Sequence, residues 1–189
     1  DIERRMRKLR PDADFAVASN PEFLREGAAI PDFMAPDRVL VGVDDQRAKT
    51  MMEELYAPLI AKGVPVLFTG RESAELAKYI ANAFLALKVS FINEVADLCE
   101  QIGADVTEVA TAIGKDKRIG ERFLSPGPGF GGSCFPKDVA ALIRTAREAE
   151  AELTLVEQLQ TVNEERKIAM AKRIEGLLGG SVEGKTIAL

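Results

Sequence analysis

The amino-acid sequence predicts an α+β protein that is mainly α, in which the end of an α/β domain is followed by a helical middle domain. Short apolar runs at 15–18, 39–43 and 64–68 predict strands, with a helix over about 45–62 between the last two. From Ser73 onward, apolar residues recur at every third or fourth position, which is typical of long helices. The change of pattern places a domain boundary near residue 70.

The elements of the first part follow in order along the chain. A short basic helix over Ile2–Leu9 precedes the first strand, Phe15–Ala18, which ends in a turn at Ser19-Asn20-Pro21. The strand–helix–strand order of 39–68 is typical of half an α/β sheet. No glycine-rich GxGxxG turn lies between these elements. We therefore interpret residues 1–70 as the C-terminal part of a dinucleotide-binding domain whose first half is absent.

The helical part, residues 71–180, is built on two long helices. Ser73 is a candidate N-cap for a helix that runs to Ile102, and about thirty residues at ~1.5 Å each make it roughly 45 Å long. Shorter helices are predicted over 105–113 and from Pro136, and a second long one over 153–178. The apolar faces of the long helices exceed what this chain can cover, so we expect a homodimer built on them.

The two ends of the chain suggest a piece of a longer protein. Residues 181–189 end in Lys185-Thr186-Ile187-Ala188-Leu189, which reads as the first strand of a truncated further domain. The chain opens at Asp1 without an initiator Met. The sequence is therefore expected to be a fragment.

Charge and hydropathy exclude several classes of partner. Lys and Arg number 25 against 30 Asp and Glu, a formal net charge of -5, so no broad attraction to nucleic acid or anionic membranes is expected. No apolar stretch is long enough for a membrane span and no signal segment opens the chain, which favours a cytoplasmic location. The chain contains no His, so a Cys/His zinc site is excluded and no metal is expected. Acid–base chemistry must then use carboxylates, Lys, water or a thiolate.

The most informative motif is the run from Gly129 to Asp138, Gly-Phe-Gly-Gly-Ser-Cys-Phe-Pro-Lys-Asp. Pro136 suits the first turn of a helix, so Cys134 is expected at a helix amino end. The helix dipole there and the nearby Lys137 favour the thiolate, the form that attacks a carbonyl. A buried structural cysteine is the alternative. Cys99 lies in the middle of a helical pattern and is interpreted as a packing residue.

Two further groups of polar residues are candidates for a site. Glu75, Lys78 and Asn82 have spacings of three and four residues, which place them on one face of the long helix. Such a trio is also typical of a solvated face. The segment 20–27, Asn-Pro-Glu-Phe-Leu-Arg-Glu-Gly, carries the carboxylates Glu22 and Glu26 after a predicted strand, where ligands commonly bind. An ordinary charged helix start is the alternative.

Together these three segments closely resemble the UDP-glucose/GDP-mannose dehydrogenase family, and the resemblance covers nearly the whole chain. The runs 37–42, Asp-Arg-Val-Leu-Val-Gly, and 110–114, Ala-Thr-Ala-Ile-Gly, are also similar to that family. The resemblance implies a helical middle domain like that of 6-phosphogluconate dehydrogenase, flanked by an NAD-binding domain and by a UDP-binding domain that would begin at 181–189. The amino-terminal strands with the glycine fingerprint and nearly all of the third domain are expected to be missing from this sequence.

The resemblance also implies a reaction, the four-electron oxidation of a nucleotide-sugar alcohol to a carboxylate with two NAD and one water. It implies catalytic roles for Cys134, which would carry a thiohemiacetal and then a thioester, and for Lys78, Asn82 and Asp138. Glu22 is our choice for the base that activates the hydrolytic water, with Glu26 as the alternative or as a neighbour of the nicotinamide. Lys137 is expected near the cofactor. The substrate-binding residues implied are Phe23, Leu24, Arg25, Arg118, Phe123, Gly129, Phe130, Gly131 and Gly132.

Single residues favour UDP-glucose as the sugar. The run 116–120, Asp-Lys-Arg-Ile-Gly, resembles the UDP-glucose branch, in which the arginine matching Arg118 reaches the sugar of a neighbouring subunit. Phe135 after the cysteine points the same way, since the GDP-mannose branch usually has Leu there. GDP-mannose or another nucleotide sugar remains an alternative. So do a two-electron 3-hydroxyacid dehydrogenase of the 6-phosphogluconate type, which has no use for a catalytic cysteine, and a catalytically silent dimerisation fragment.

Overall fold

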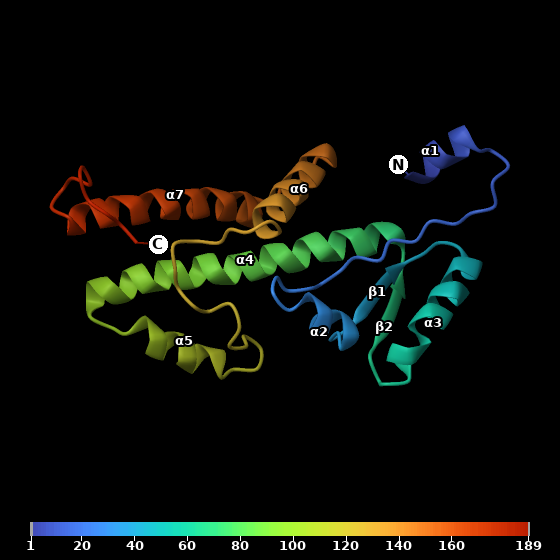
Figure 1. Cartoon of the computed structure of the whole chain (residues 1–189), viewed down its shortest axis with the longest axis horizontal. Helices are drawn as coiled ribbons and strands as arrows, with labels where there is room; N and C mark the ends of the chain where they lie inside the picture. Colours follow the sequence, from blue (N-terminus) through green and yellow to red (C-terminus); the bar gives the residue numbers. More distant parts are fainter. Residues whose placement is uncertain (1, 189) are drawn as a thin grey trace. The chain divides into compact units, whose positions relative to one another are not determined.

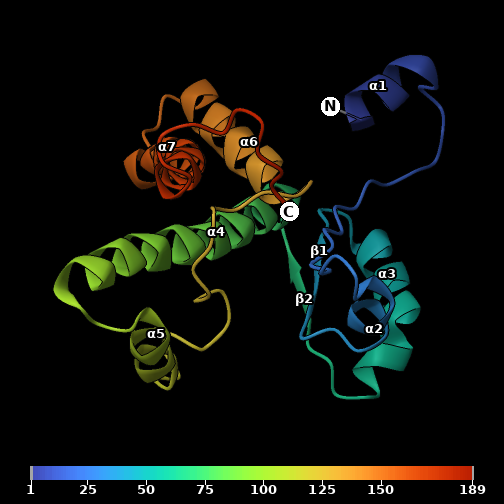
Figure 2. The ribbon, with the colours of Figure 1, turned by 60° about the vertical axis from the view of Figure 1, so that its left-hand side comes forward.

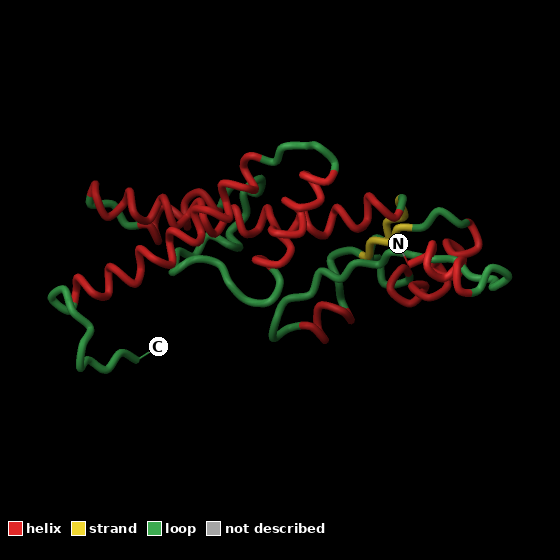
Figure 3. The backbone as a smooth tube through the Cα atoms, turned by 90° about the horizontal axis from the view of Figure 1, so that it is seen from above, coloured by secondary structure: helices red, strands yellow, loops and turns green. Residues whose placement is uncertain are grey.

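The structure is a computed structural model that describes residues 2–188 and is mainly helical, as the sequence predicts (Figure 3). The chain forms two compact units, the first closing at Lys78 and the second beginning at Tyr79. Over the described residues no helix is long and apolar enough to cross a membrane.

The first unit contains a two-stranded parallel sheet, and its helix α3 connects the strands (Figure 2). Strand β1 is Val39–Gly42, α3 is Gln46–Ile60 and β2 is Val66–Thr69. Asp45 caps α3, its side chain accepting a hydrogen bond from the Ala48 amide at 3.0 Å. The predicted strand–helix–strand unit is therefore confirmed. Helix α1, Ile2–Leu9, is confirmed as well.

The predicted strand at Phe15–Ala18 is wrong. Only Ser19 pairs with the sheet, in an antiparallel bridge to Gly42 in which both backbone amides donate, at 2.8 and 2.7 Å. A strand needs repeated backbone hydrogen bonds to a neighbouring strand. Residues 15–18 have only the adjacent bridge at Ser19, so they remain irregular. Helix α2, Ala29–Met34, was not predicted; its six residues contain Pro31 and bury no side chain, which leaves no periodic signal.

The long helix α4, Arg71–Ile102, begins two residues before the predicted N-cap Ser73. The Ala74 amide already donates to the Gly70 carbonyl at 3.1 Å, so Ser73 lies inside the first turn. Gly42 allows the helix to begin this early. A Cβ on Gly42 would lie 2.7 Å from both the Ala74 Cβ and the Arg71 Cα. The absent side chain lets the first turn of α4 pack directly on the end of β1.

The second unit is a set of helices packed beside the rest of α4 (Figure 1). They are α5 (Val106–Gly114), α6 (Phe135–Glu148) and α7 (Thr154–Leu177). Arg173 of α7 forms a two-bond ion pair with Glu100 of α4, both bonds at 2.8 Å, so these two helices lie side by side. Buried residues of α4, α6, α7 and the loop before α6 form one core: Ala83, Ala86, Phe130, Val139, Leu142, Ile143 and Leu159.

The predicted strand at 185–189 is not formed over Lys185–Ala188, and Leu189 lies outside the described residues. A strand needs a neighbour to satisfy its backbone hydrogen bonds, and within residues 2–188 the only paired strands are β1 and β2. Residues 183–184 form a turn instead.

Candidate active site

The segment 20–25 is fixed to strand β1 and presents Glu22 to Lys78. The Asn20 side chain donates to the Leu40 carbonyl at 2.8 Å, which anchors the start of the segment. Glu22 Oε1 then accepts a bond from Lys78 Nζ at 3.0 Å, and Glu22 Oε2 accepts the Leu24 amide at 2.6 Å. The Lys78 side chain is 13% exposed and that of Glu22 is 52% exposed. The pair thus holds a shielded ammonium against a carboxylate that reaches solvent.

Two cations lie close to the Phe23 ring. The Arg38 guanidinium carbon lies 4.0 Å from the ring centroid, and Lys78 Nζ lies 5.5 Å from it. Cations are attracted to the face of an aromatic ring at such distances. Phe23 therefore helps to hold Lys78 in place, and Arg38 is a member of this group that the sequence did not reveal.

Arg25 forms an ion pair with Asp32 of α2. Its Nη2 lies 2.6 Å from Asp32 Oδ1, and its Nε and backbone amide both donate to Asp32 Oδ2 at 2.9 Å. The hydrogen bond and charge of Asp32 raise the pKa of Arg25 above its usual value. Glu26 follows on the exposed surface.

Cys134 lies at the amino end of α6, where the sequence places it. Its carbonyl accepts the Asp138 amide at 2.9 Å, the first bond of the helix, and its sulfur lies 3.7 Å from Ser133 Oγ. The thiol is free and partly buried. Cys99 is also free, but it is buried within α4, which confirms its interpretation as a packing residue.

A buried hydrogen bond joins α4 to α6 one turn after the cysteine. Asn82 Nδ2 donates to Asp138 Oδ2 at 2.6 Å, and the two residues are 8% and 1% exposed. Lys137 Nζ lies 3.4 Å from the other oxygen of Asp138. Its hydrogen bond and charge interaction with Asp138 raise the pKa of Lys137, with a smaller contribution from Cys134. Lys137 thus stays charged at neutral pH on a largely exposed side chain.

Three aromatic rings lie around the start of α6. The Phe135 ring centroid is 6.0 Å from that of Phe123 and 6.2 Å from that of Phe130, the latter in an edge-to-face arrangement. Phe123 has a φ of 66°, a left-handed conformation that is uncommon for a side chain of this size. Such backbone strain persists where the surroundings hold it and is frequent at ligand sites.

The glycine-rich loop before Cys134 is held by polar residues that sequence reasoning missed. Asn163 of α7 bonds the backbone of Phe130, while Asn93 of α4 and Arg166 of α7 bond that of Gly127. One signal was available: Asn163 lies four residues after Leu159 on a buried helix face, and Asn is unfavourable inside helices. A polar residue at such a position needs a specific partner.

Arg118 lies in the exposed loop after α5. Its side chain is 90% exposed and pairs with Asp116, Nη2 to Oδ2 at 2.6 Å. Lys88 of α4 fixes this loop by donating to the carbonyls of Ile119 and Gly120 at 2.9 and 3.1 Å.

The predicted site residues thus fall into two groups. Glu22, Phe23 and Lys78 lie together in the first unit, and Asn82, Asp138, Lys137, Cys134 and the three rings lie in the second. Lys78 and Asn82 are four residues apart on α4, so one helix carries a member of each group. Glu75, the third residue of the predicted helical face, is exposed.

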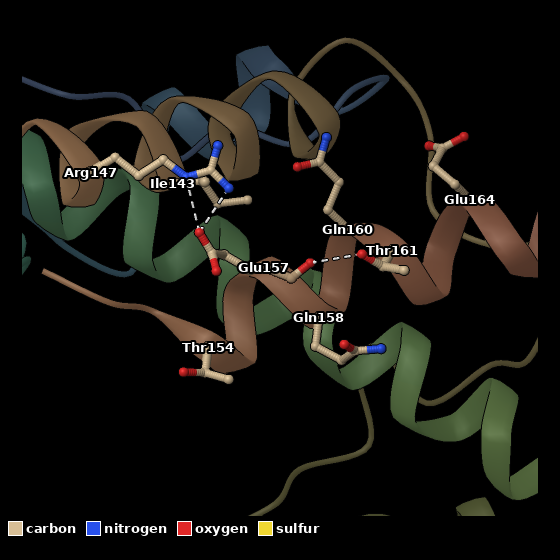
Figure 4. A pocket seen from close by; sticks show the side chains of 8 residues that line it. All are labelled: Ile143, Arg147, Thr154, Glu157, Gln158, Gln160, Thr161 and Glu164. Carbon is tan, nitrogen blue, oxygen red and sulfur yellow. Dashed lines mark hydrogen bonds and ion pairs between the residues drawn. The ribbon is translucent and has the colours of Figure 1, made fainter.

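A groove between α6 and α7 lies apart from these groups (Figure 4). Arg147 crosses it to Glu157, with Nη2 and Nε donating to Oε1 at 2.9 and 3.1 Å. None of the predicted site residues lines it.

Two models of one protein family match this chain. Residues 72–165 match the central domain of the UDP-glucose/GDP-mannose dehydrogenase family, and residues 2–60 match its NAD binding domain. The chain belongs to this family.

Among curated relatives, the UDP-glucose 6-dehydrogenase of Rhizobium meliloti (strain 1021) is 52% identical over 191 aligned positions, which cover 100% of this chain and 44% of the relative. The UDP-glucose 6-dehydrogenase of Rickettsia prowazekii (strain Madrid E) is 46% identical over 93% of this chain and 40% of its own length. A solved UDP-glucose dehydrogenase from Pyrobaculum islandicum superposes with a TM-score of 0.89 at 42% identity, covering 94% of this chain and 40% of that one. The chain thus spans less than half the length of these relatives.

Proposed function

We propose that this chain carries the catalytic residues of an NAD-dependent dehydrogenase that oxidises UDP-glucose to UDP-glucuronate. The observation that carries the proposal is Cys134 at the amino end of α6, one turn before the buried bond between Asn82 and Asp138. A free thiol at a helix start can act as a nucleophile, and a two-electron alcohol dehydrogenase would not need one. Membership of the family and the two relatives named UDP-glucose 6-dehydrogenase support the same reaction.

The residues present fit a nicotinamide dinucleotide in part. Lys137 is 72% exposed and positively charged, which suits an anionic cofactor, and Glu26 is our second candidate for a cofactor contact. The parallel pair β1 and β2 with α3 is the kind of unit found in dinucleotide-binding sheets. NAD supplies hydride acceptance, once for each of the two oxidation steps.

In the first oxidation the C6 alcohol of the sugar loses a proton and a hydride and becomes an aldehyde. Lys78 stabilises the negative charge that develops on the alcohol oxygen, and the shielding of its ammonium from water supports this role. Asn82 and Asp138 hold a water that accepts the proton. Their mutual bond at 2.6 Å fixes both side chains for this task.

In the second oxidation the Cys134 thiolate adds to the aldehyde carbon, and the resulting oxyanion is protonated to a thiohemiacetal. Loss of a second hydride and the hydroxyl proton leaves a thioester on Cys134. Glu22 removes a proton from the water that attacks this thioester, which releases the carboxylate and regenerates the thiol. Its carboxylate is 52% exposed and anchored by Lys78, so it is both reachable by water and held in place.

The remaining predicted residues bind the nucleotide sugar in this proposal. Phe23, Leu24 and Arg25 line the path of the sugar and phosphates, and Arg25 would exchange or share its ion pair with Asp32. Phe123 and the loop Gly129–Gly132 hold the nucleotide. Amides of such a loop can bond a ligand directly because glycine leaves them uncovered. We place the enzyme in the cytoplasm.

The proposal is tested in a chimera in which this chain replaces the matching segment of the Rhizobium meliloti relative. We expect the chimera to form about two NADH for each UDP-glucose consumed, since each hydride transfer reduces one NAD. GDP-mannose should be oxidised far more slowly. One NADH for each sugar would indicate an alcohol-to-aldehyde enzyme, and no oxidation of UDP-glucose would contradict the proposed function.

We also propose that the chain forms a homodimer through its long helices. Large apolar side chains of α4 are at least half exposed at positions about seven residues apart, Phe84 at 62%, Phe91 at 52% and Leu98 at 54%. A stripe of this kind favours a partner helix. Light scattering at micromolar concentration should give twice the monomer mass of 20.5 kDa. Charged substitutions at Phe84 and Phe91 should return the mass to that of a monomer, and a monomeric unaltered chain would contradict the proposal.

Arg118 serves the neighbouring subunit's sugar site in this dimer. Its exposed guanidinium, oriented by Asp116, is free to reach beyond its own loop.

A further inference from the structure

The Asn163 side chain brackets the backbone of a single residue in the glycine-rich loop. Its Oδ1 accepts the Phe130 amide at 2.7 Å, and its Nδ2 donates to the Phe130 carbonyl at 3.0 Å. Asn163 is 2% exposed and Phe130 is 6% exposed, so both bonds are shielded from water. Losing a buried amide partner leaves unpaired backbone groups, which costs more than the bond alone.

The neighbouring Gly129 leaves room for the Asn163 side chain because it has no Cβ. Gly129 has a φ of 117°, and a Cβ at this position would lie 2.7 Å from Asn163 Oδ1. An alanine there would meet both an unfavourable backbone conformation and a collision. The loop and Asn163 therefore fit each other as one unit.

Two other side chains hold the loop three residues earlier. Asn93 Oδ1 accepts the Gly127 amide at 2.7 Å, and Arg166 Nε donates to the Gly127 carbonyl at 3.1 Å. Arg166 is itself held by an ion pair with Asp97 of α4. Asn163 and Arg166 are three residues apart, so one face of α7 contacts both ends of the segment 127–130.

We infer that Asn163 is a positioning residue that presets the loop leading to Cys134. It acts through Phe130, whose ring packs in the core and against the ring of Phe135, the first residue of α6 after Cys134. A loop already held in its bound shape loses less entropy when a ligand binds, so affinity is higher. The link to nucleotide-sugar binding rests on the proposed function, whereas the two hydrogen bonds between Asn163 and Phe130 do not depend on it.

Alkylation of the two cysteines separates positioning from simple stability. In the unaltered chain iodoacetamide should modify Cys134 before the buried Cys99 at neutral pH. In Asn163→Leu, which has a similar size but no polar atoms, the Phe130 amide should exchange with deuterium at least about tenfold faster. The Cys134 labelling rate should change by about threefold or more while Cys99 stays protected.

Leu159→Ala is the matched control, because Leu159 is 3% exposed one turn earlier on α7 and packs in the core with a side chain that cannot form hydrogen bonds. It should lower the unfolding temperature without changing Phe130 exchange or Cys134 labelling at temperatures where the chain is folded. Gly129→Ala disturbs the same hydrogen bonds by a change in the loop, and it provides the test if Asn163→Leu does not fold. It should reproduce the changes at Phe130 and Cys134.

Three outcomes would overturn the inference. The first is that Phe130 exchange and Cys134 labelling are unchanged in both Asn163→Leu and Gly129→Ala. The second is a parallel rise in Cys99 labelling, which would indicate general unfolding, and the third is the same response in Leu159→Ala. In the chimera, Asn163→Leu should raise the KM for UDP-glucose by about tenfold with a smaller change in kcat. An inactive unaltered chimera would contradict the proposed function alone, since alkylation and exchange test the bracket without substrate.

Discussion

Replacing Cys134 with serine in the chimera is expected to lower the rate of UDP-glucuronate formation by at least about 1,000-fold. A serine hydroxyl at the start of α6 ionises far less readily than a thiol, so addition to the aldehyde fails. An ester on serine would also hydrolyse less readily than a thioester. The measurement is the product itself, resolved from substrate by chromatography after incubation with NAD.

The matched control is Cys99→Ala, which removes the other thiol from a buried position in α4. It should lower stability slightly and leave the rate of acid formation close to that of the unaltered chimera. Cys134→Ser that still forms acid at a comparable rate would remove the nucleophile from the mechanism. The family reaction would then require a different route in this chain.

The sequence predicted the elements that have a strong local signal. The period of apolar residues in 73–102 and 153–178 predicted α4 and α7 to within two residues at each end. The predicted helices at about 45–62 and 105–113 match α3 and α5 to within two residues, and in the structure Asp45 and Asp105 are their N-caps. The strand at 15–18 failed because apolar character cannot show whether a strand will find a partner. Helix α2 was missed because six residues give less than two full turns.

The candidate site divides in the same way. Cys134, Lys78 and Asn82 were visible because their residue types are chemically demanding and stand at helical spacings or at a helix start. Their hydrogen-bond partners could not be predicted in this way, because the bond from Asn82 to Asp138 joins residues 56 positions apart. Arg38 over Phe23 and Asn163 around Phe130 are likewise set by packing between distant segments, so no local pattern contains them.

Glu22→Gln in the chimera is expected to convert steady turnover into a burst of NADH followed by a slow rate. Glutamine keeps the size of the side chain and can still accept the Leu24 amide, but it cannot take a proton from water. Both oxidations precede hydrolysis, so the burst should reach about two NADH for each active site. Loss of a general base should then slow the steady rate by about 10²- to 10⁴-fold.

The thioester that accumulates on Cys134 after this burst should be visible by mass spectrometry of the acid-quenched protein. Glu26→Gln is the matched control, since Glu26 lies four residues further along the same segment, and its variant should turn over without a stalled adduct. The ion pair provides a second check: Lys78 loses its carboxylate partner in Glu22→Gln, so the first oxidation must be measured separately, as the burst rate. A normal steady rate in Glu22→Gln, or an adduct that appears only in Glu26→Gln, would assign the base to Glu26 or to a water held by Asp138.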